Sequence, residues 1–529
     1  MRSIYKLYLY LIILISITIG IFNSQFVNDG YHWGFIYANS MDILYGKKIY
    51  KEIFLEYGLL QSLINYLIIK YINDSVLSIQ VYTIIIYSLS FLFIFKIVFN
   101  ITNNDKLSFL SVLMIFIINP WAISPWPIYH SFFFTTLFVY FFLKNNKFSP
   151  YLSGLFLFFS YLSYTTLYNF ILLFLLFILL SFIFIDKFFL KKNINLKLIK
   201  LVISFVILFF VFLYFLIHKE ILMEWLKYQK IPFLIKENFN LSFVVLVIDY
   251  IDFIIYRPFF NLVYEPQWLI YSLLFISNIF LILIYLYKIF SKKEYDKINY
   301  EIFIILLFIL SLNIIAQVKT FSYVSCSLSL SIIPFAILFK KINNKENQII
   351  IIFILSFITI YSLFNFDMKF SKYAEDRYRS IKHLYELENK KLNQKKISYL
   401  KYFKLDDNYW NFIFEQNNLI SNIKKNCKNI NGVNLTEDTY LYLLIGPNSF
   451  QKVPFYLDSS IYKLNDIFDS ELKKKIQYRI NDNSIFLITN KNNEKNLTFN
   501  KHYEIIKIYK KTNKIIDEEF RIIFPKKCN

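Results

Sequence analysis

The chain has 529 residues, of which 57% are hydrophobic and 21% aromatic, and its formal net charge at pH 7 is +21. Apolar runs of about 18 residues or more, enough to cross a bilayer as a helix, recur through the first two-thirds of the sequence. The cations lie in the connections between these runs and in the polar C-terminal part, with no compact basic motif beside aromatic residues. This pattern excludes a nucleic-acid-binding protein and indicates a helical membrane protein that crosses the bilayer many times.

The first apolar run, residues 4–22, predicts a membrane helix that is retained as an anchor, because no small-x-small cleavage site follows it. The sequence FVNDGYHW, residues 26–33, comes directly afterwards. Asp29 is therefore expected at the outer mouth of the first helix, where ionisable groups are candidates for function. The alternative is an interfacial acid that caps the next helix.

The segment between the first two spans, about residues 23–74, is too long for a turn and too apolar for a free loop. Apolar side chains at helical spacing predict a short helix over residues 33–45, which Gly46 ends. A second apolar stretch, residues 59–71, is expected to lie along the outer interface without crossing. Glu56 stands between the two helices as a second acid, or as a neighbour of a helix N-cap.

Ten further spans and a clear charge asymmetry set the predicted orientation. With the N-terminus inside, the even-numbered connections carry lysines, whereas the short opposite connections 119–129 and 164–168 carry no Lys or Arg. The positive-inside rule then places Asp29 and the C-terminal part outside. The ten spans are predicted at residues 75–99, 107–124, 129–143, 149–165, 167–185, 197–217, 267–290, 301–316, 322–339 and 347–364.

Two cations are candidates for binding an anionic group at the outer face. Arg257 lies in the large outer connection 218–266, and Lys319 lies near an outer helix end. Either could bind a phosphate, the arginine through two parallel hydrogen bonds. The alternative for both is that the charged end reaches from the helix to lipid headgroups.

Three histidines, His32, His130 and His218, fall at predicted outer helix ends. They could hydrogen-bond a sugar or, with Asp29, bind a divalent metal. No His-x-x-x-His or similar ligand spacing is present, so the pattern itself requires neither a metal nor another cofactor.

The part after residue 366 is polar and long enough, at about 160 residues, to bury a core of its own. It predicts a soluble mixed α/β domain, 367–529, outside the membrane. Helices are expected at 371–391 and 410–425, and strands at 440–445, 485–489, 503–509 and 520–524. Cys427 and Cys528 could pair on this oxidising side, whereas Cys326 falls in a membrane helix.

The residues after the first helix resemble the start of the GT-C glycosyltransferases: an acid in FVNDGYHW, an amphipathic helix ending at YGKKIYK, and then EYGLL. The similar branch is bacterial, akin to protein O-mannosyltransferases and aminoarabinose transferases. The resemblance covers residues 1 to about 366 in architecture and about 25–75 in motif. It implies a polyprenyl-phosphate-linked sugar donor, a catalytic acid in the first outer loop, and two juxtamembrane helices there. The chain departs from many members in having one acid, Asp29, where they have a pair.

The sequence thus predicts an all-α polytopic membrane bundle, residues 1–366, with about eleven transmembrane and two interfacial helices, followed by the soluble domain. The expected activity is a glycosyltransferase of a bacterial plasma membrane that moves a sugar to an extracytoplasmic glycan, lipid or protein. Asp29 would be the general base, and His32, Glu56, His130, Arg257 and Lys319 would bind substrate. Alternatives are a polymerase or ligase of lipid-linked polysaccharide, a transporter or flippase, and a scaffold. The nearly uncharged helix centres argue against transport.

Overall fold

The computed structural model describes sixteen stretches of the chain, and it groups the residues into two compact units. The helical unit comprises Met1–Asn23, Val81–Phe215 and Leu241–Glu386, and the mixed unit comprises Ser24–Gln80, Leu216–Asn240 and Leu387–Asn529. The predicted domain boundary at residue 366 lies outside the described residues and stays a prediction. The described residues are 2–25, 32–55, 58–119, 122, 124–165, 192–228, 267–290, 300–319, 330–341, 391–392, 397–405, 407–436, 438–449, 474–490, 497–510 and 518–529.

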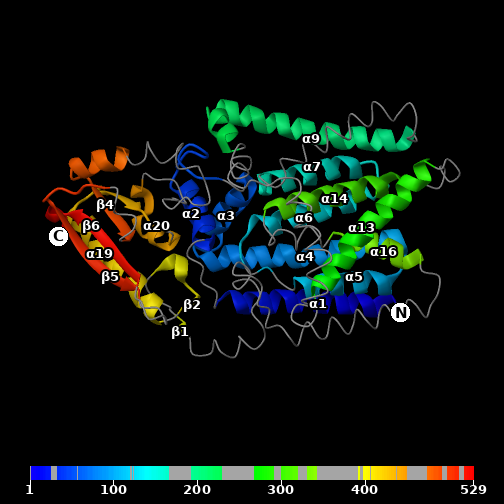
Figure 1. The fold of residues 1–529 in the computed structure, drawn as a ribbon, viewed down its shortest axis with the longest axis horizontal. Coiled ribbons are helices and arrows are strands. Elements are labelled where there is room, and N and C mark those ends of the chain that lie inside the picture. The colour runs from blue at the N-terminus through cyan, green and yellow to red at the C-terminus, as the bar shows by residue number, and fades with distance from the viewer. Residues whose placement is uncertain are drawn as a thin grey trace. The chain divides into compact units, whose positions relative to one another are not determined.

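Long apolar helices make up the described part of the helical unit (Figure 1). Local signals in the sequence fix several helix starts: the side chain of Asn104 accepts a hydrogen bond from the backbone N–H of Leu107, and Pro127 is the first residue of its helix. The helices are α1 (Arg2–Ser24), α4 (Val76–Thr102), α5 (Asp105–Ile118), α6 (Pro127–Phe142), α7 (Ser149–Ser163), α9 (Lys192–His218), α13 (Gln267–Phe290), α14 (Tyr300–Lys319) and α16 (Ile332–Lys341).

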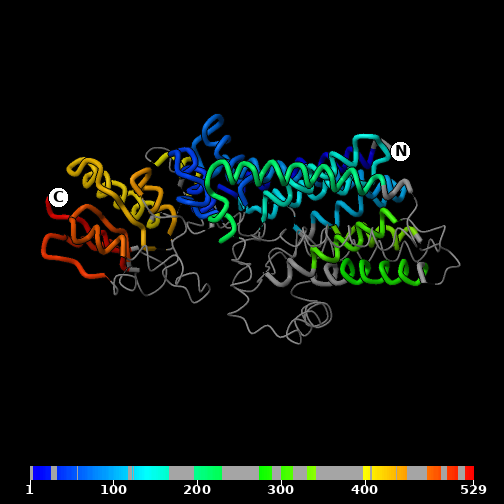
Figure 2. Tube along the Cα trace, turned by 90° about the horizontal axis from the view of Figure 1, so that it is seen from above, coloured from blue at the N-terminus to red at the C-terminus, as the bar shows by residue number. Residues whose placement is uncertain are grey.

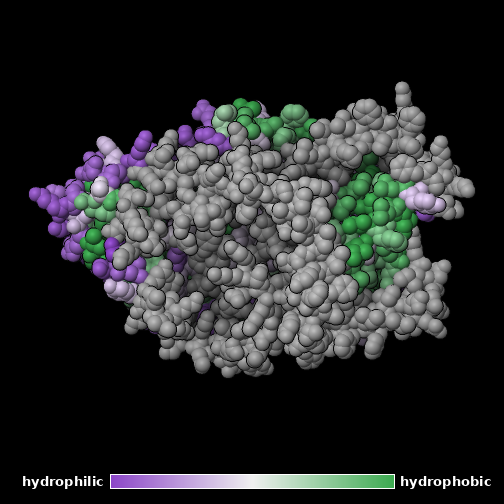
Figure 3. All heavy atoms as spheres, in the orientation of Figure 1, coloured by the Kyte–Doolittle hydropathy of each residue, from purple (hydrophilic) through white to green (hydrophobic). Residues whose placement is uncertain are grey.

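Within the described residues, three helices are long and apolar enough to cross a membrane: Ile4–Ser24, Val76–Thr102 and Leu196–His218. Shorter apolar helices occupy other predicted spans, and Figure 3 shows hydrophobic side chains on the exposed surface of α13. The chain is therefore mostly helical with apolar helices of membrane-crossing length. The count of eleven stays a prediction, because spans 167–185 and 347–364 lie outside the described residues.

Small polar side chains join the helices of this unit. Ser16 of α1 and Ser88 of α4 are hydrogen-bonded through their hydroxyls at 2.8 Å, and the Thr135 hydroxyl of α6 donates to Ser160 of α7 at 3.0 Å. On α7, a Cβ added to Gly154 would lie 2.5 Å from the carbonyl oxygen of Leu201 on α9, so glycine permits this close approach. Close packing and interhelical hydrogen bonds of this kind hold helices together where lipid removes the hydrophobic drive.

The segment between α1 and α4 belongs to the mixed unit and forms two separate helices, as predicted for residues 33–45 and 59–71. They are α2 (His32–Leu44) and α3 (Leu59–Tyr71), each of 13 residues. A helix of that length extends about 20 Å, less than the hydrocarbon thickness of about 30 Å. Residues 59–71 are therefore too short for a complete crossing.

The C-terminal part of the mixed unit contains a four-stranded sheet with strand order β3-β4-β6-β5. The strands β3 (Asn431–Asn434) and β4 (Ile485–Asn490) are parallel, and β6 (Glu518–Pro525) pairs antiparallel with β4 and with β5 (Tyr503–Lys510). The predicted strands at 485–489, 503–509 and 520–524 are confirmed. A two-residue pairing, β1 (Lys391–Leu392) with β2 (Lys404–Leu405), lies apart from this sheet.

One helix, α19 (Asp407–Asn426), lies along a face of the sheet, as Figures 1 and 2 both show, and it confirms the helix predicted at 410–425. Its Phe412 ring meets that of Phe520 on β6 at 4.8 Å between centroids. Of the other predicted helix, 371–391, residues 371–390 lie outside the described part and Lys391 begins β1.

The strand predicted at residues 440–445 is wrong: these residues form the helix α20 (Thr439–Ile445). The carboxylate of Asp438 accepts a hydrogen bond from the backbone N–H of Tyr440 and caps the helix start. All seven residues of α20 are buried, so the run has no polar face that would distinguish a helix from a strand. Gly446, at a φ of 64°, follows the last helical residue.

A disulfide joins Cys427, just after α19, to Cys528, in the short turn after β6. Their Cα atoms are 5.3 Å apart and 101 positions separate them in the sequence. The pairing left open by the sequence therefore forms, and it ties the last residues of the chain to the helix on the sheet.

Replacing Cys528 with Ser should lower the free energy of unfolding of the mixed unit by about 2–4 kcal/mol, because the reduced unfolded chain gains conformational freedom. Pulse proteolysis of the full chain across a urea series measures this as an earlier midpoint for loss of the C-terminal fragment. Cys326→Ser is the matched control and should leave the midpoint unchanged. Equal midpoints for the two variants would contradict a stabilising role for the disulfide.

Candidate functional site

Only one of the six predicted site residues has a described side chain. His32 begins α2 and Lys319 ends α14, but their side chains lie outside the described part of the structure. The structure therefore does not test whether the predicted residues converge on one site. The residues wholly outside the described part are Asp29, Glu56 and Arg257.

His130 is fully buried in α6 of the helical unit. Its Nε2 atom lies 3.3 Å from the hydroxyl of Thr83 on α4, and its ring centroid is 5.4 Å from that of Tyr82. Its Nδ1 atom has no hydrogen-bond partner among the described residues. These contacts join α6 to α4, and the predicted substrate-binding role of His130 stays a prediction.

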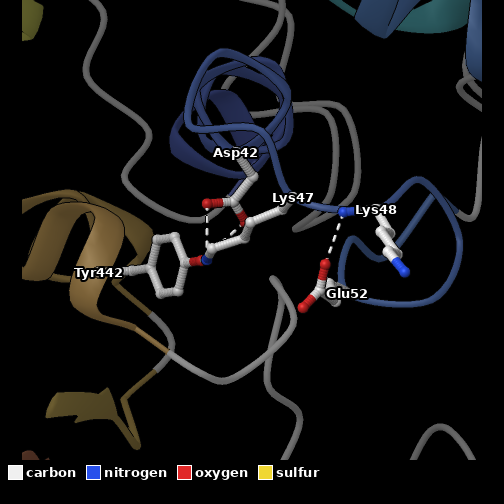
Figure 4. Close-up of polar contacts among 5 residues, drawn as sticks. All are labelled: Asp42, Lys47, Lys48, Glu52 and Tyr442. Atoms are coloured by element: carbon white, nitrogen blue, oxygen red, sulfur yellow. Dashed lines mark hydrogen bonds and ion pairs between the residues drawn. The ribbon is translucent and has the colours of Figure 1, made fainter.

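The mixed unit contains a buried polar cluster that joins the segment between α1 and α4 to the C-terminal part (Figure 4). Asp42 on α2 is fully buried, and one carboxylate oxygen lies 2.8 Å from the ammonium nitrogen of Lys47. The hydroxyl of Tyr442 on α20 donates to the other oxygen at 2.7 Å. Lys47 in turn donates to that hydroxyl at 2.7 Å, which closes a triangle of three side chains.

The end of α2 brings Lys47 back to Asp42. Gly46 adopts a φ of 80°, a left-handed conformation that favours glycine, and the backbone N–H of Lys47 donates to the Asp42 carbonyl at 3.0 Å. The Lys47 ammonium then lies at the helix C-terminus, where positive charge is favoured. The backbone N–H of the exposed Lys48 donates to Glu52 at 2.7 Å, which closes the next turn of the loop.

Burial determines the protonation of the cluster. Loss of solvation raises the pKa of Asp42 to about 6, although the Lys47 ammonium and the Tyr442 hydroxyl both lower it. Burial also raises the pKa of Tyr442 well above its usual value, and the neighbouring Asp42 carboxylate raises it further. At neutral pH Asp42 is therefore a carboxylate and Tyr442 a neutral phenol.

Further contacts hold α2 against the C-terminal residues of the mixed unit. Trp33 faces Phe403 at 6.3 Å between ring centroids. A Cβ on Gly34 would lie 2.9 Å from the hydroxyl of Thr439, so α2 and α20 approach closely at a glycine. The Tyr37 hydroxyl donates to Asp74, and burial raises the pKa of Tyr37 far above its usual value.

A small pocket lies between α2 and α3. Hydrophobic and polar groups share its lining, and the Asn39 amide nitrogen donates to the Phe54 carbonyl at 2.8 Å beside it. Gly58, which lines the pocket, is two positions after Glu56 in the sequence. Its lining residues are Phe35, Ile36, Asn39, Leu55, Gly58, Gln61 and Ser62.

Asp42 and Tyr442 were not among the residues predicted from the sequence. A local signal existed for Asp42, because it is the only Asp, Glu, Lys or Arg within the thirteen residues of α2. Tyr442 had no such signal, since it meets Asp42 across 400 positions of the sequence. The Lys47 ammonium and the Tyr442 hydroxyl contact the two oxygens of Asp42, and the residue is buried, which favours a role in positioning the segment over contact with substrate.

Within the described part of the chain, no group of three or more His, Cys, Asp or Glu side chains could hold a metal ion. The alternative of a metal at Asp29 is not tested, because that residue is outside the described part. No model of a known protein family matches the chain, and no curated protein is significantly similar to it.

Lys47→Met should lower the free energy of unfolding by about 3–5 kcal/mol, because it leaves the Asp42 carboxylate buried without its cation. Chemical unfolding of the full chain in detergent measures the loss. Lys48→Met removes an equal charge from an exposed neighbour and should change stability by less than about 0.5 kcal/mol. The double variant Asp42→Asn, Lys47→Met should recover much of the lost stability. Equal effects of the two single lysine variants would refute the ion pair's contribution.

The raised pKa of Asp42 predicts a pH dependence. The pKa in the folded chain, about 6, exceeds the ordinary value of 3.8, so the folded chain binds this proton more tightly than the unfolded chain. The contribution of Asp42 to the free energy of unfolding therefore increases as pH falls from about 6 to about 4, by about 3 kcal/mol in total. Melting temperatures measured across this window should show the increase in the parent chain and a smaller one in Asp42→Asn. Melting temperatures that change with pH in the same way in the parent chain and in Asp42→Asn would contradict this pH dependence.

Proposed function

We propose that this protein is a GT-C-type glycosyltransferase that moves a sugar from a polyprenyl-phosphate carrier to an extracytoplasmic acceptor. The observation that carries the proposal is the order of the helices between α1 and α4. After the apolar helix α1 and the acidic sequence around Asp29, two short helices, α2 and α3, precede the long apolar helix α4. The resemblance in sequence implies this order of elements.

The reaction requires a base for the acceptor proton and a cation for the carrier phosphate that leaves. In the proposed mechanism, Asp29 takes the proton from the acceptor hydroxyl or amine as that group attacks the anomeric carbon. The bond from this carbon to the phosphate oxygen breaks, and Arg257, with Lys319, binds the phosphate that carries the developing charge. His32, Glu56 and His130 are the proposed contacts to the sugar or acceptor.

The mixed unit fixes the position of α2, the helix that follows the proposed base in the sequence. Asp29 is three positions before His32, the first residue of α2, and α2 is held by the Asp42–Lys47–Tyr442 cluster and the close contact at Gly34. The proposal includes eleven crossings in residues 1–366, with residues 367–529 outside.

Asp29→Asn should lower the rate of sugar transfer by roughly 10²–10⁴ while donor binding is retained, because the amide keeps the size of the side chain but cannot accept the proton. The assay uses membranes with equal amounts of protein and a panel of radiolabelled polyprenyl-phosphate sugars, and it measures release of polyprenyl phosphate. Arg257→Ala should instead raise the donor concentration required, since phosphate binding occurs in both ground and transition states.

Asp105→Asn is the matched control, because it makes the same chemical change at the start of α5 and should leave the rate unchanged. A full rate in Asp29→Asn would make Asp29 an interfacial cap and remove the proposed base. If the parent chain releases polyprenyl phosphate from no member of the panel, the proposed donor class is wrong.

A further inference from the structure

An exposed patch on the mixed unit combines hydrophobic, aromatic and cationic side chains from two distant parts of the sequence. At the end of α3, Tyr71 is 70% exposed and Ile72 is 77% exposed, and both lie beside the exposed Lys70. The other part is the turn that contains Lys401 and Tyr402, where the Tyr402 side chain lies beside that of Asn73. We call these five residues, Lys70, Tyr71, Ile72, Lys401 and Tyr402, the α3-end patch.

The cations of the patch lie over its aromatic rings. The ammonium of Lys70 is 5.1 Å from the ring centroid of Tyr71, and that of Lys401 is 4.9 Å from the ring of Tyr402. Each pair therefore presents an apolar ring with a positive charge above it. Side chains with an apolar body and a polar or charged end are typical of the boundary between lipid and water. The nearby carboxylate of Asp74 accepts the hydrogen bond from Tyr37.

Each half of the patch is connected, through the chain or through a backbone hydrogen bond, to a residue next to a candidate membrane span. Ile72 is four positions before Val76, the first residue of α4, so at most about 14 Å of extended chain separates them. The backbone N–H of Lys404 donates to the carbonyl of Gln25 at 2.7 Å, and Gln25 directly follows the last residue of α1. Both α1 and α4 contain candidate membrane spans.

We propose that the α3-end patch binds the bilayer surface, with Ile72, Tyr71 and Tyr402 among the lipid headgroups and the two lysines beside anionic headgroup phosphates. Positive side chains at this depth attract anionic lipids. The patch thereby anchors the C-terminal residues of the mixed unit to the membrane through a second point besides the crossing helices. This inference rests on the membrane crossings of α1 and α4 and is independent of the proposed sugar transfer.

The test places a bimane label at Ile72→Cys in a Cys326→Ser background of the full chain, since Cys427 and Cys528 are paired and do not react. The protein is reconstituted in nanodiscs of phosphatidylcholine alone or mixed with phosphatidylglycerol, and lipids with a nitroxide at the headgroup quench the label. The control label is at Tyr478→Cys, which is 67% exposed in the same unit.

Quenching at Ile72 should exceed that at Tyr478 about twofold or more, and phosphatidylglycerol should increase it. The pair Lys70→Gln, Lys401→Gln should abolish the increase with phosphatidylglycerol, while quenching in phosphatidylcholine alone remains. Equal quenching at the two positions would overturn the proposed contact with the bilayer. If quenching at Ile72 changes neither with phosphatidylglycerol nor with the two lysine substitutions, the proposed role of the headgroup phosphates is wrong. Unchanged melting temperatures establish that the labelled variants are folded.

Discussion

The buried carboxylate of Asp42 is the constraint on which the mixed unit depends. A carboxylate taken out of water without a partner costs several kcal/mol, so the fold must bring a cation and hydrogen-bond donors to it. Lys47 reaches it through the left-handed turn at Gly46, within the same segment. Tyr442 supplies its hydroxyl from a position 400 residues later. The segment between α1 and α4 therefore reaches its final environment only when the C-terminal residues are in place, and the two form one compact unit.

The same contacts restrict where α2 can lie. Apolar side chains alone would allow α2 to shift along α20, since hydrophobic contact is not directional. The hydroxyl of Tyr442 meets one carboxylate oxygen, and Gly34 is the residue at which α2 comes closest to Thr439. A shift of one helical turn would separate the first pair and place a Cβ-bearing residue at the second point.

Much of this local structure could be predicted, and the exceptions have physical causes. Helical spacing located α2, α3 and α19, and alternating or β-branched runs located β4, β5 and β6. Residues 440–445 were misassigned because α20 is buried on every side, so its apolar run fits a helix or a strand equally well. The N-cap carboxylate of Asp438 was the local signal that distinguishes the two. The partnership of Asp42 with Tyr442 left no local pattern, because its two halves are far apart in sequence.

The energetic character of the cluster indicates why a charged pair occupies a site that apolar residues could fill. Burial raises the pKa of Asp42 even though Lys47 lies 2.8 Å away, so the attraction does not fully repay the loss of solvation. A well-packed apolar replacement would be at least as stable by this argument. An apolar replacement would not impose one geometry on the contact. Only the polar triangle requires one orientation of Tyr442 and one conformation of the turn at Gly46. We infer that the main role of the cluster is to specify how α2 packs against α20. Its contribution to the free energy of unfolding is secondary to that role.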